Sequence, residues 1–128
     1  MSFCTAINCM DGRTQLPVNK YLTALLGVEY VDTITEPGPV KILGEQQESD
    51  LANSILRRVG ISVGKHGSNC ITIVSHYDCA GNPVGEERQK KQLEAATSFL
   101  CEKYPGISII GVWVDSDWRV HKVYSVNS

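Results

Sequence analysis

Hydrophobic and polar positions along the chain form two kinds of segment. Short runs of β-branched and aliphatic residues predict strands, and longer segments with apolar residues at helical spacing predict helices. The predicted strands are 3–8, 28–35, 70–74, 107–114 and 118–126, and the predicted helices are 16–26, 49–59 and 85–104. Strands and helices therefore alternate along most of the chain. The last two strands follow each other across the turn Asp115-Ser116-Asp117, which predicts a hairpin.

This alternation predicts an α/β fold: a three-layer domain with a mostly parallel sheet, helices on both faces and an antiparallel hairpin edge strand at the C-terminus. At 128 residues, the chain is expected to form a single domain spanning residues 1–128. Pro17 is expected in the first turn of its helix. Glu36-Pro37-Gly38-Pro39 is expected to be a fixed loop, because its prolines interrupt strands and helices. The glycine-rich stretch 60–69 is expected to be a surface connection, and 44–48 either opens the next helix or leads into it.

Composition narrows the class of protein. Hydrophobic residues make up 42% of the chain and charged residues 20%, which is typical of a globular protein. A formal net charge of −2 is too small to attract nucleic acid or an anionic membrane, so neither is expected as a partner. No apolar run approaches the ~20 residues that a bilayer span needs, and no secretory signal is expected.

Five cysteines are an odd number for a disulfide framework, which would be more typical of a smaller secreted chain. Cys4, Cys70 and Cys101 lie in apolar or amphipathic segments, where reduced thiols pack as small core residues. We therefore expect a reducing, cytoplasmic environment.

The candidate chemistry follows two predicted strands. His76-Tyr77-Asp78-Cys79 comes after the apolar run 70–74, and Cys9 comes after the first strand. The carboxyl ends of parallel strands meet at one edge of a sheet, so the two clusters are expected to lie together. Thiolate sulfur and imidazole nitrogen are ligands that zinc takes in a tetrahedron, and Cys9 is the best candidate for a third ligand beside His76 and Cys79.

Cys9-Met10-Asp11-Gly12-Arg13 and His76-Tyr77-Asp78-Cys79, taken together, resemble the Cys-x-Asp-x-Arg and His-x-x-Cys motifs of the β-class carbonic anhydrases. The resemblance extends in outline over most of residues 3–126. It implies a Zn²⁺ cofactor held by Cys9, His76 and Cys79, with the fourth position open to water. It also implies that Asp11 and Arg13 form the catalytic dyad.

The implied activity is that of a zinc lyase, which hydrates carbon dioxide reversibly to bicarbonate. Zinc lowers the pKa of bound water to ~7 and so supplies hydroxide at neutral pH. In the resembled family, the aspartate at the position of Asp11 orients this hydroxide, while the arginine at the position of Arg13 holds the carboxylate off the metal through a two-pronged pairing. In some members the aspartate instead takes the fourth zinc position and closes the site.

The chain departs from the family at several places. Typical members carry Arg-Asn-x-Gly-Asn after the second strand, where this chain has Thr35-Glu36-Pro37-Gly38-Pro39. The glycine that usually follows the last zinc cysteine is Ala80 here, with Gly81 next. These departures leave two alternatives open: a zinc-stabilised binding or regulatory module without turnover, and a hydrolase of carbonyl sulfide or carbon disulfide. A thiol redox protein is disfavoured because the chain has no Cys-x-x-Cys pair.

A homodimer or a higher even oligomer is expected for two reasons. The strand 107–114 is strongly apolar, with Trp113 within it and Trp118 just after it, which suggests more apolar surface than a small monomer can cover. The resembled family also places its active sites at a dimer interface. Against this, the chain shows no counterpart of the N-terminal helical arm that many members use to clasp a second subunit.

The remaining polar residues near these motifs have simpler interpretations. His66 and His121 have no partner at metal spacing and are interpreted as surface or structural residues. His66, in a glycine-rich stretch, is alternatively a candidate proton shuttle. Tyr77 and Asp78 are candidates for orienting His76.

Overall fold

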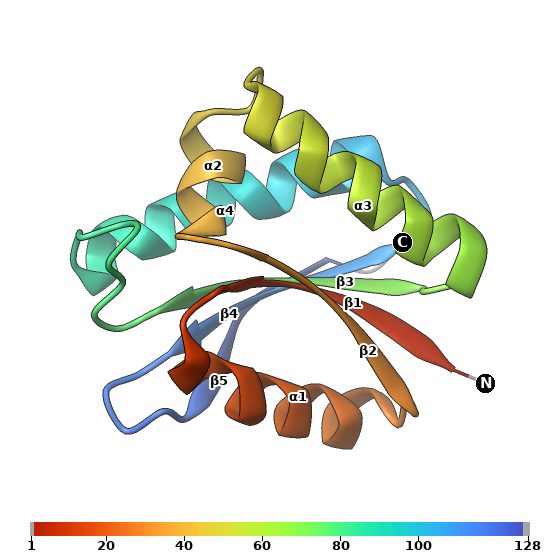
Figure 1. Cartoon of the computed structure of the whole chain (residues 1–128), viewed down its shortest axis with the longest axis horizontal. Coiled ribbons are helices and arrows are strands. Elements are labelled where there is room, and N and C mark those ends of the chain that lie inside the picture. The colour runs from red at the N-terminus through yellow and green to blue at the C-terminus, as the bar shows by residue number, and fades with distance from the viewer. Residues whose placement is uncertain (1, 127–128) are drawn as a thin grey trace.

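The computed structural model describes residues 2–126, and its strands form one five-stranded sheet in the order β2-β1-β3-β4-β5 (Figure 1). The strands are β1 (Phe3–Cys9), β2 (Tyr30–Glu36), β3 (Cys70–His76), β4 (Ser108–Val114) and β5 (Val120–Val126). The first four run parallel, and β5 pairs antiparallel with β4. The predicted α/β fold with its C-terminal hairpin is therefore confirmed.

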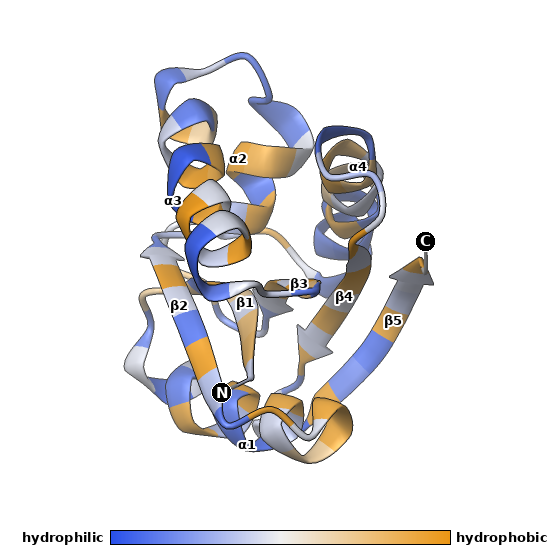
Figure 2. Ribbon diagram, turned by 90° about the vertical axis from the view of Figure 1, so that its right-hand side faces the viewer, coloured by the Kyte–Doolittle hydropathy of each residue, from blue (hydrophilic) through white to orange (hydrophobic). Residues whose placement is uncertain are grey.

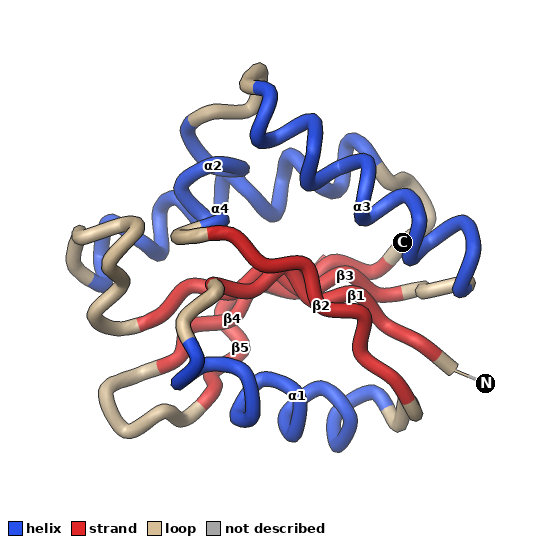
Figure 3. Tube along the Cα trace, viewed as in Figure 1, coloured by secondary structure: helices blue, strands red, loops and turns tan. Residues whose placement is uncertain are grey.

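Helices cover both faces of the sheet, as Figure 3 shows. One face carries α1 (Gly12–Leu26), and the other carries α2 (Pro39–Glu45), α3 (Asp50–His66) and α4 (Glu86–Lys103). Alternate residues of each strand point to opposite faces, so the inner strands contribute side chains to two separate hydrophobic cores. Ile7, Ile71 and Ile73 pack toward the three-helix side, whereas Cys4 and Ala6 pack with α1. In Figure 2 the two edge strands alternate between hydrophilic and hydrophobic residues, while β4 is mostly hydrophobic.

Helix α2 was not predicted, because Pro39 was interpreted as the end of a fixed loop. The structure shows that Pro39 instead begins a helix, where its missing N–H costs nothing. Gly38 precedes it with a φ of 64°, in the left-handed region that favours glycine. The helix buries Val40, Ile42 and Leu43, which secures a segment too short to be stable alone.

Helix α3 is longer than predicted, and the expected surface connection 60–69 is wrong for residues 60–66. The helix continues through two glycines and ends at Gly67, whose φ is 69°. Each glycine costs only ~1 kcal/mol in a helix. That cost is offset at Ser62, which is buried and hydrogen-bonded to Thr5, Asp32 and Ser68.

Helix α1 begins earlier than predicted, because the Asp11 side chain accepts a hydrogen bond from the Arg13 N–H and caps the helix. Pro17 therefore lies inside the helix rather than in its first turn. The early start matters for the site, since it places Asp11 and Arg13 on a rigid helix end directly after β1.

The apolar residues of β4 are buried within the chain's own core. Its residues from Ile109 to Val114 are at most 5% exposed wherever they carry an apolar side chain. The inference that this strand offers surface to a second subunit is therefore wrong, because β3, β5, α1 and α4 cover it within the same chain. Cys4 and Cys70 are buried as expected, and Cys101 is half-buried. Within residues 2–126, no helix combines the length and apolarity that crossing a membrane requires.

Candidate metal centre

Cys9, His76 and Cys79 meet at the carboxyl edge of the sheet. Cys9 ends β1, His76 ends β3, and Cys79 lies in the loop that follows. All three are buried, their ligand atoms all lie within 4.8 Å of one another, and the two sulfur atoms are 3.9 Å apart. Two thiolates bound to one tetrahedral zinc at ~2.3 Å would lie about 3.8 Å apart. The spacing therefore fits a zinc ion, and the structure brings together all three residues predicted as ligands.

The orientation of His76 also fits a metal ligand. Its Nδ1 lies 2.7 Å from the carbonyl oxygen of Tyr77, which fixes the proton on Nδ1 and leaves the lone pair on Nε2. That Nε2 is buried and has no hydrogen-bond partner among the described residues. A buried unpaired nitrogen is costly, and a metal ion would satisfy it. Tyr77 was a candidate for orienting His76, and it does so through its main chain.

The charges around the two sulfur atoms favour a cation between them. The hydrogen bond from the Cys79 thiol lowers the pKa of Cys9 to about 4, helped by the neighbouring His76 ring and the backbone N–H groups of Gly38 and Asp11. The Cys9 sulfur in turn raises the pKa of Cys79. Cys9 is therefore the sulfur that gives up its proton more readily. Burial alone would lower the pKa of His76, but the neighbouring Cys9 raises it overall.

Asp11 and Arg13 form a bidentate ion pair at the rim of this cluster. The Arg13 Nη2 donates to Asp11 Oδ2 at 2.7 Å, and Nε donates to Asp11 Oδ1 at 3.1 Å. This pairing lowers the pKa of Asp11 to about 2, so the carboxylate is ionised at neutral pH. The cluster of ligand atoms found within residues 2–126 includes Cys9, His76 and Cys79 but not Asp11. The structure therefore has the aspartate engaged by the arginine rather than gathered with the three ligands.

Two residues hold Arg13 from the other side. Its guanidinium lies 4.5 Å over the Trp118 ring, and it donates to the carbonyl oxygen of Asp78 at 3.2 Å. Asp78, a candidate for orienting His76, instead contacts Arg13. Asp78 and Trp118 have φ values of 57° and 61°, and they are the two non-glycine residues with positive φ in the described part of the chain. Aspartate tolerates this region, and Trp118 lies in the turn between β4 and β5, where its N–H donates to the Asp115 carbonyl at 2.9 Å.

A small cavity of about 190 Å³ lies beside the ligands, lined by Cys9, Met10, Asp11, Pro37, Ala80 and Gly81. It is smaller than the ~300–1,000 Å³ typical of pockets for drug-sized ligands. The two loops that meet beside it require two glycines, of which Gly81 lines the cavity. A Cβ on Gly81 would lie 2.6 Å from Pro37, and one on Gly38 would lie 2.8 Å from the Asn82 Cβ. The segment 35–39, which contains Gly38, was interpreted from the sequence as a departure from the family. Its glycine between two prolines was the signal that the backbone here is tightly packed.

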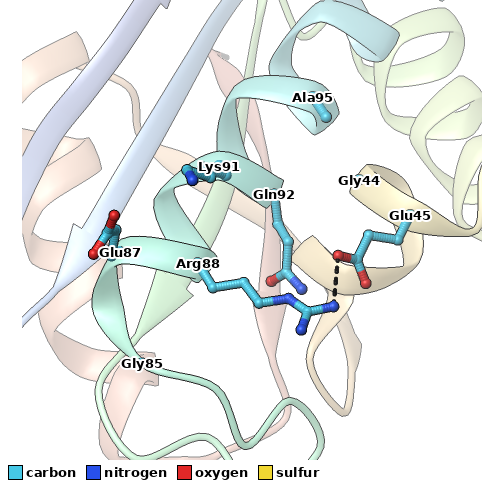
Figure 4. Close-up of a pocket in the computed structure, with 8 residues that line it drawn as sticks. All are labelled: Gly44, Glu45, Gly85, Glu87, Arg88, Lys91, Gln92 and Ala95. Carbon is cyan, nitrogen blue, oxygen red and sulfur yellow. Dashed lines mark hydrogen bonds and ion pairs between the residues drawn. The ribbon is translucent and has the colours of Figure 1, made fainter.

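A larger cavity, about 630 Å³ in volume, lies between α2 and α4 (Figure 4). Arg88 spans it to reach Glu45 at 3.3 Å, and charged side chains line much of it. None of the three candidate ligands borders this cavity, so it is separate from the candidate metal centre. One of its lining residues, Gln92, extends from α4 toward the side of α2 and also contacts Asn82.

The other two histidines lie outside the cluster. His121 is paired with Asp115 at 2.7 Å. His66 is paired with Asp32 at 2.6 Å and stacks on Phe3, with ring centroids 4.2 Å apart. Phe3 begins β1 and Cys9 ends it, so roughly 20 Å of strand separates His66 from the candidate ligands. That distance prevents His66 from exchanging protons directly with the site.

A Cys-His-Cys cluster at the carboxyl edge of a mostly parallel sheet defines a candidate metalloprotein of the α/β class. A family model described as "Putative carbonic anhydrase" matches residues 1–124. The chain belongs to this family. No curated protein sequence matches it.

Two solved structures have a similar fold. One belongs to a pair of tetrameric β-carbonic anhydrases from the filamentous ascomycete Sordaria macrospora, with a TM-score of 0.59 and 13% identity; the match covers 96% of this chain and 81% of that one. The other is the β-carbonic anhydrase CafA of the fungal pathogen Aspergillus fumigatus, with a TM-score of 0.54 and 14% identity, covering 94% of this chain and 74% of that one. At these identities the likeness concerns the fold.

Proposed function

We propose that the protein is a zinc-dependent carbonic anhydrase that hydrates carbon dioxide reversibly to bicarbonate. The observation that carries this proposal is the buried, unpartnered Nε2 of His76 beside the sulfur atoms of Cys9 and Cys79. This donor set suits zinc, and three protein ligands leave one position for water, as in catalytic sites. Membership of the family and the shared fold support the same activity.

The residues around the ligands would have distinct roles. When bound, zinc supplies a nucleophile at neutral pH by lowering the pKa of water from 15.7 to ~7. Asp11, ionised because of Arg13, would accept a hydrogen bond from the attacking water and orient its oxygen. Arg13 would keep Asp11 from becoming a fourth ligand. The small cavity has apolar walls at Met10 and Pro37, which suit a small linear molecule of low polarity.

The test is stopped-flow hydration of carbon dioxide, measured from pH 6 to 9 on zinc-loaded protein and on protein stripped by a chelator. We expect turnover that requires zinc and rises with pH as the water loses its proton. Zinc binding without turnover across this range would refute the enzyme and favour the zinc-stabilised module. Hydrolysis of carbonyl sulfide in the absence of carbon dioxide turnover would move the activity to the sulfur analogue.

We also propose that the protein works as a homodimer or a higher even oligomer in the cytoplasm. The Sordaria enzymes are described as tetrameric. Large apolar side chains remain exposed in the segments after β1 and β3, with Met10 at 63%, Leu16 at 62% and Tyr77 at 49%. The five unpaired thiols suit a reducing compartment. Sedimentation velocity at micromolar concentration tests the assembly, and a monomer at all concentrations would refute it.

A further inference from the structure

His76 occupies a place in the sheet where its backbone loses a strand neighbour. β1 and β3 are in register from Thr5–Ile71 to Ile7–Ile73, whereas β4 follows β3 to its end at His76. The N–H of Tyr77 donates to Val114 of β4, so the backbone groups of His76, one residue earlier, point to the β1 side. These groups are buried and need partners that β1 no longer supplies.

A side chain from α4 takes the place of the missing strand. Gln89 is 1% exposed, and its amide lies against the His76 backbone. The His76 N–H donates to Gln89 Oε1 at 3.2 Å, and Gln89 Nε2 donates to the His76 carbonyl at 2.9 Å. The same Nε2 donates its second proton to the carbonyl of Val84 at 3.2 Å. Every donor of this amide is therefore used, and two of its three bonds go to the candidate ligand.

A second glutamine, one turn further along α4, contacts the other half of the ligand loop. Gln92 is 3% exposed, and its Oε1 accepts a hydrogen bond from Asn82 Nδ2 at 2.6 Å. The backbone N–H of Asn82 donates to the carbonyl oxygen of Cys79 at 3.3 Å. Asn82 also packs closely against Gly38, whose backbone N–H lowers the pKa of Cys9. Gln92 therefore reaches the surroundings of both cysteines through one buried amide.

We propose that Gln89 and Gln92 are positioning residues of the metal centre, which hold the segment from His76 to Asn82 in the geometry that zinc requires. The inference rests on the metal site proposed above. Groups that orient ligands typically change metal affinity 10–100-fold when they are removed. Residues three apart on a helix share a face, so α4 supplies both contacts as one rigid element.

The test compares Gln89→Met and Gln92→Met with the control Thr97→Val. Methionine keeps the length of glutamine but removes its amide. Thr97 is also buried on α4, but within residues 2–126 its hydroxyl donates only to the carbonyl of Leu93 in its own helix. Zinc affinity is measured by competition with a chelator, and ligand geometry by the visible absorption of the cobalt-substituted protein. We expect Gln89→Met to bind zinc at least 10-fold more weakly with a shifted cobalt spectrum, while Thr97→Val changes neither.

A purely structural role would lower the thermal stability of all three variants and leave zinc affinity and the cobalt spectrum unchanged; that result overturns the inference. If Gln89→Met does not fold, Gln92→Met carries the test with the same threshold. Failure of the wild-type protein to bind zinc overturns the proposed function instead. The inference is then tested by amide hydrogen exchange at His76 in the metal-free protein, where Gln89→Met should exchange at least 10-fold faster than Thr97→Val and equal rates would overturn it.

Discussion

Replacing Gly81 with alanine adds a single methyl group where two loops of the site are in close contact. Gly81 follows Cys79 by two residues, and a Cβ there would lie 2.6 Å from both the carbonyl carbon and the Cβ of Pro37. Carbon atoms in contact normally lie 3.5–4.0 Å apart, so the two loops would have to separate by about 1 Å. Neither side yields easily, because Pro37 has a fixed φ and backbone N–H groups of both loops are directed at sulfur atoms.

Overpacking of this kind costs about 1–3 kcal/mol. For a chain of this size each kcal/mol lowers the melting temperature by about 4 °C, so Gly81→Ala should lose about 4–12 °C in a calorimetric scan. The substitution should also weaken zinc binding, since the backbone N–H of Gly81 is directed at the Cys79 sulfur.

Gly64→Ala is the matched control. Gly64 lies in α3, its Cβ would meet nothing within 4 Å, and alanine favours a helix by about 1 kcal/mol. Gly64→Ala should therefore raise the melting temperature by about 4 °C and leave zinc affinity unchanged. Wild-type melting temperature and wild-type zinc affinity in Gly81→Ala would together refute the tight packing of the two loops.

Three further predictions concern the candidate site. Cys79→Ala should lose most of its zinc in elemental analysis, because two ligands hold the ion poorly; retention of one zinc per chain would contradict the assignment. Arg13→Ala should bind zinc normally but lose nearly all carbon dioxide hydration, because Asp11 is freed to become a ligand; wild-type turnover would exclude the dyad. The folded pKa of Asp11, about 2, lies below the ordinary 3.8, so its ion pair stabilises the fold above pH 3.8 and this contribution is lost as the pH falls toward 2. Urea unfolding of metal-free wild-type and Asp11→Asn protein should therefore differ at pH 5 and converge near pH 2, whereas a constant difference would contradict the assigned pKa.

The sequence was sufficient for the sheet and for the meeting of the candidate ligands. Cys9 and His76 each end an apolar strand, and the geometry of parallel sheets places such ends at one edge whatever the details of packing. Helix α2 was missed because a proline that begins a helix looks the same in the sequence as one that ends a strand. Helix α3 was cut short because polar Ser62 has partners on three other segments, and none of them is visible locally.

The environment of the ligands was less predictable than the ligands. Gln89 is buried because β1 leaves β3 after Ile73, which is a property of the assembled sheet. No local pattern in α4 distinguishes this glutamine from a solvent-exposed one. The contact between Arg13 and Trp118 likewise joins the first helix to the last hairpin and depends on the complete strand order.

The ion pair between Arg13 and Asp11 bears on the choice between an enzyme and a module that keeps only its metal. Trp118, over which the Arg13 guanidinium lies, has a positive φ as part of the turn that joins β4 and β5, where its N–H donates to the Asp115 carbonyl at 2.9 Å. The hairpin therefore accounts for this conformation without any demand from the site. A metal held for stability alone does not need the bidentate pairing, because Asp11 is not among the gathered ligand atoms. An aspartate kept ionised, fixed and apart from the ligands has a purpose if it must orient water during turnover, which favours the enzyme.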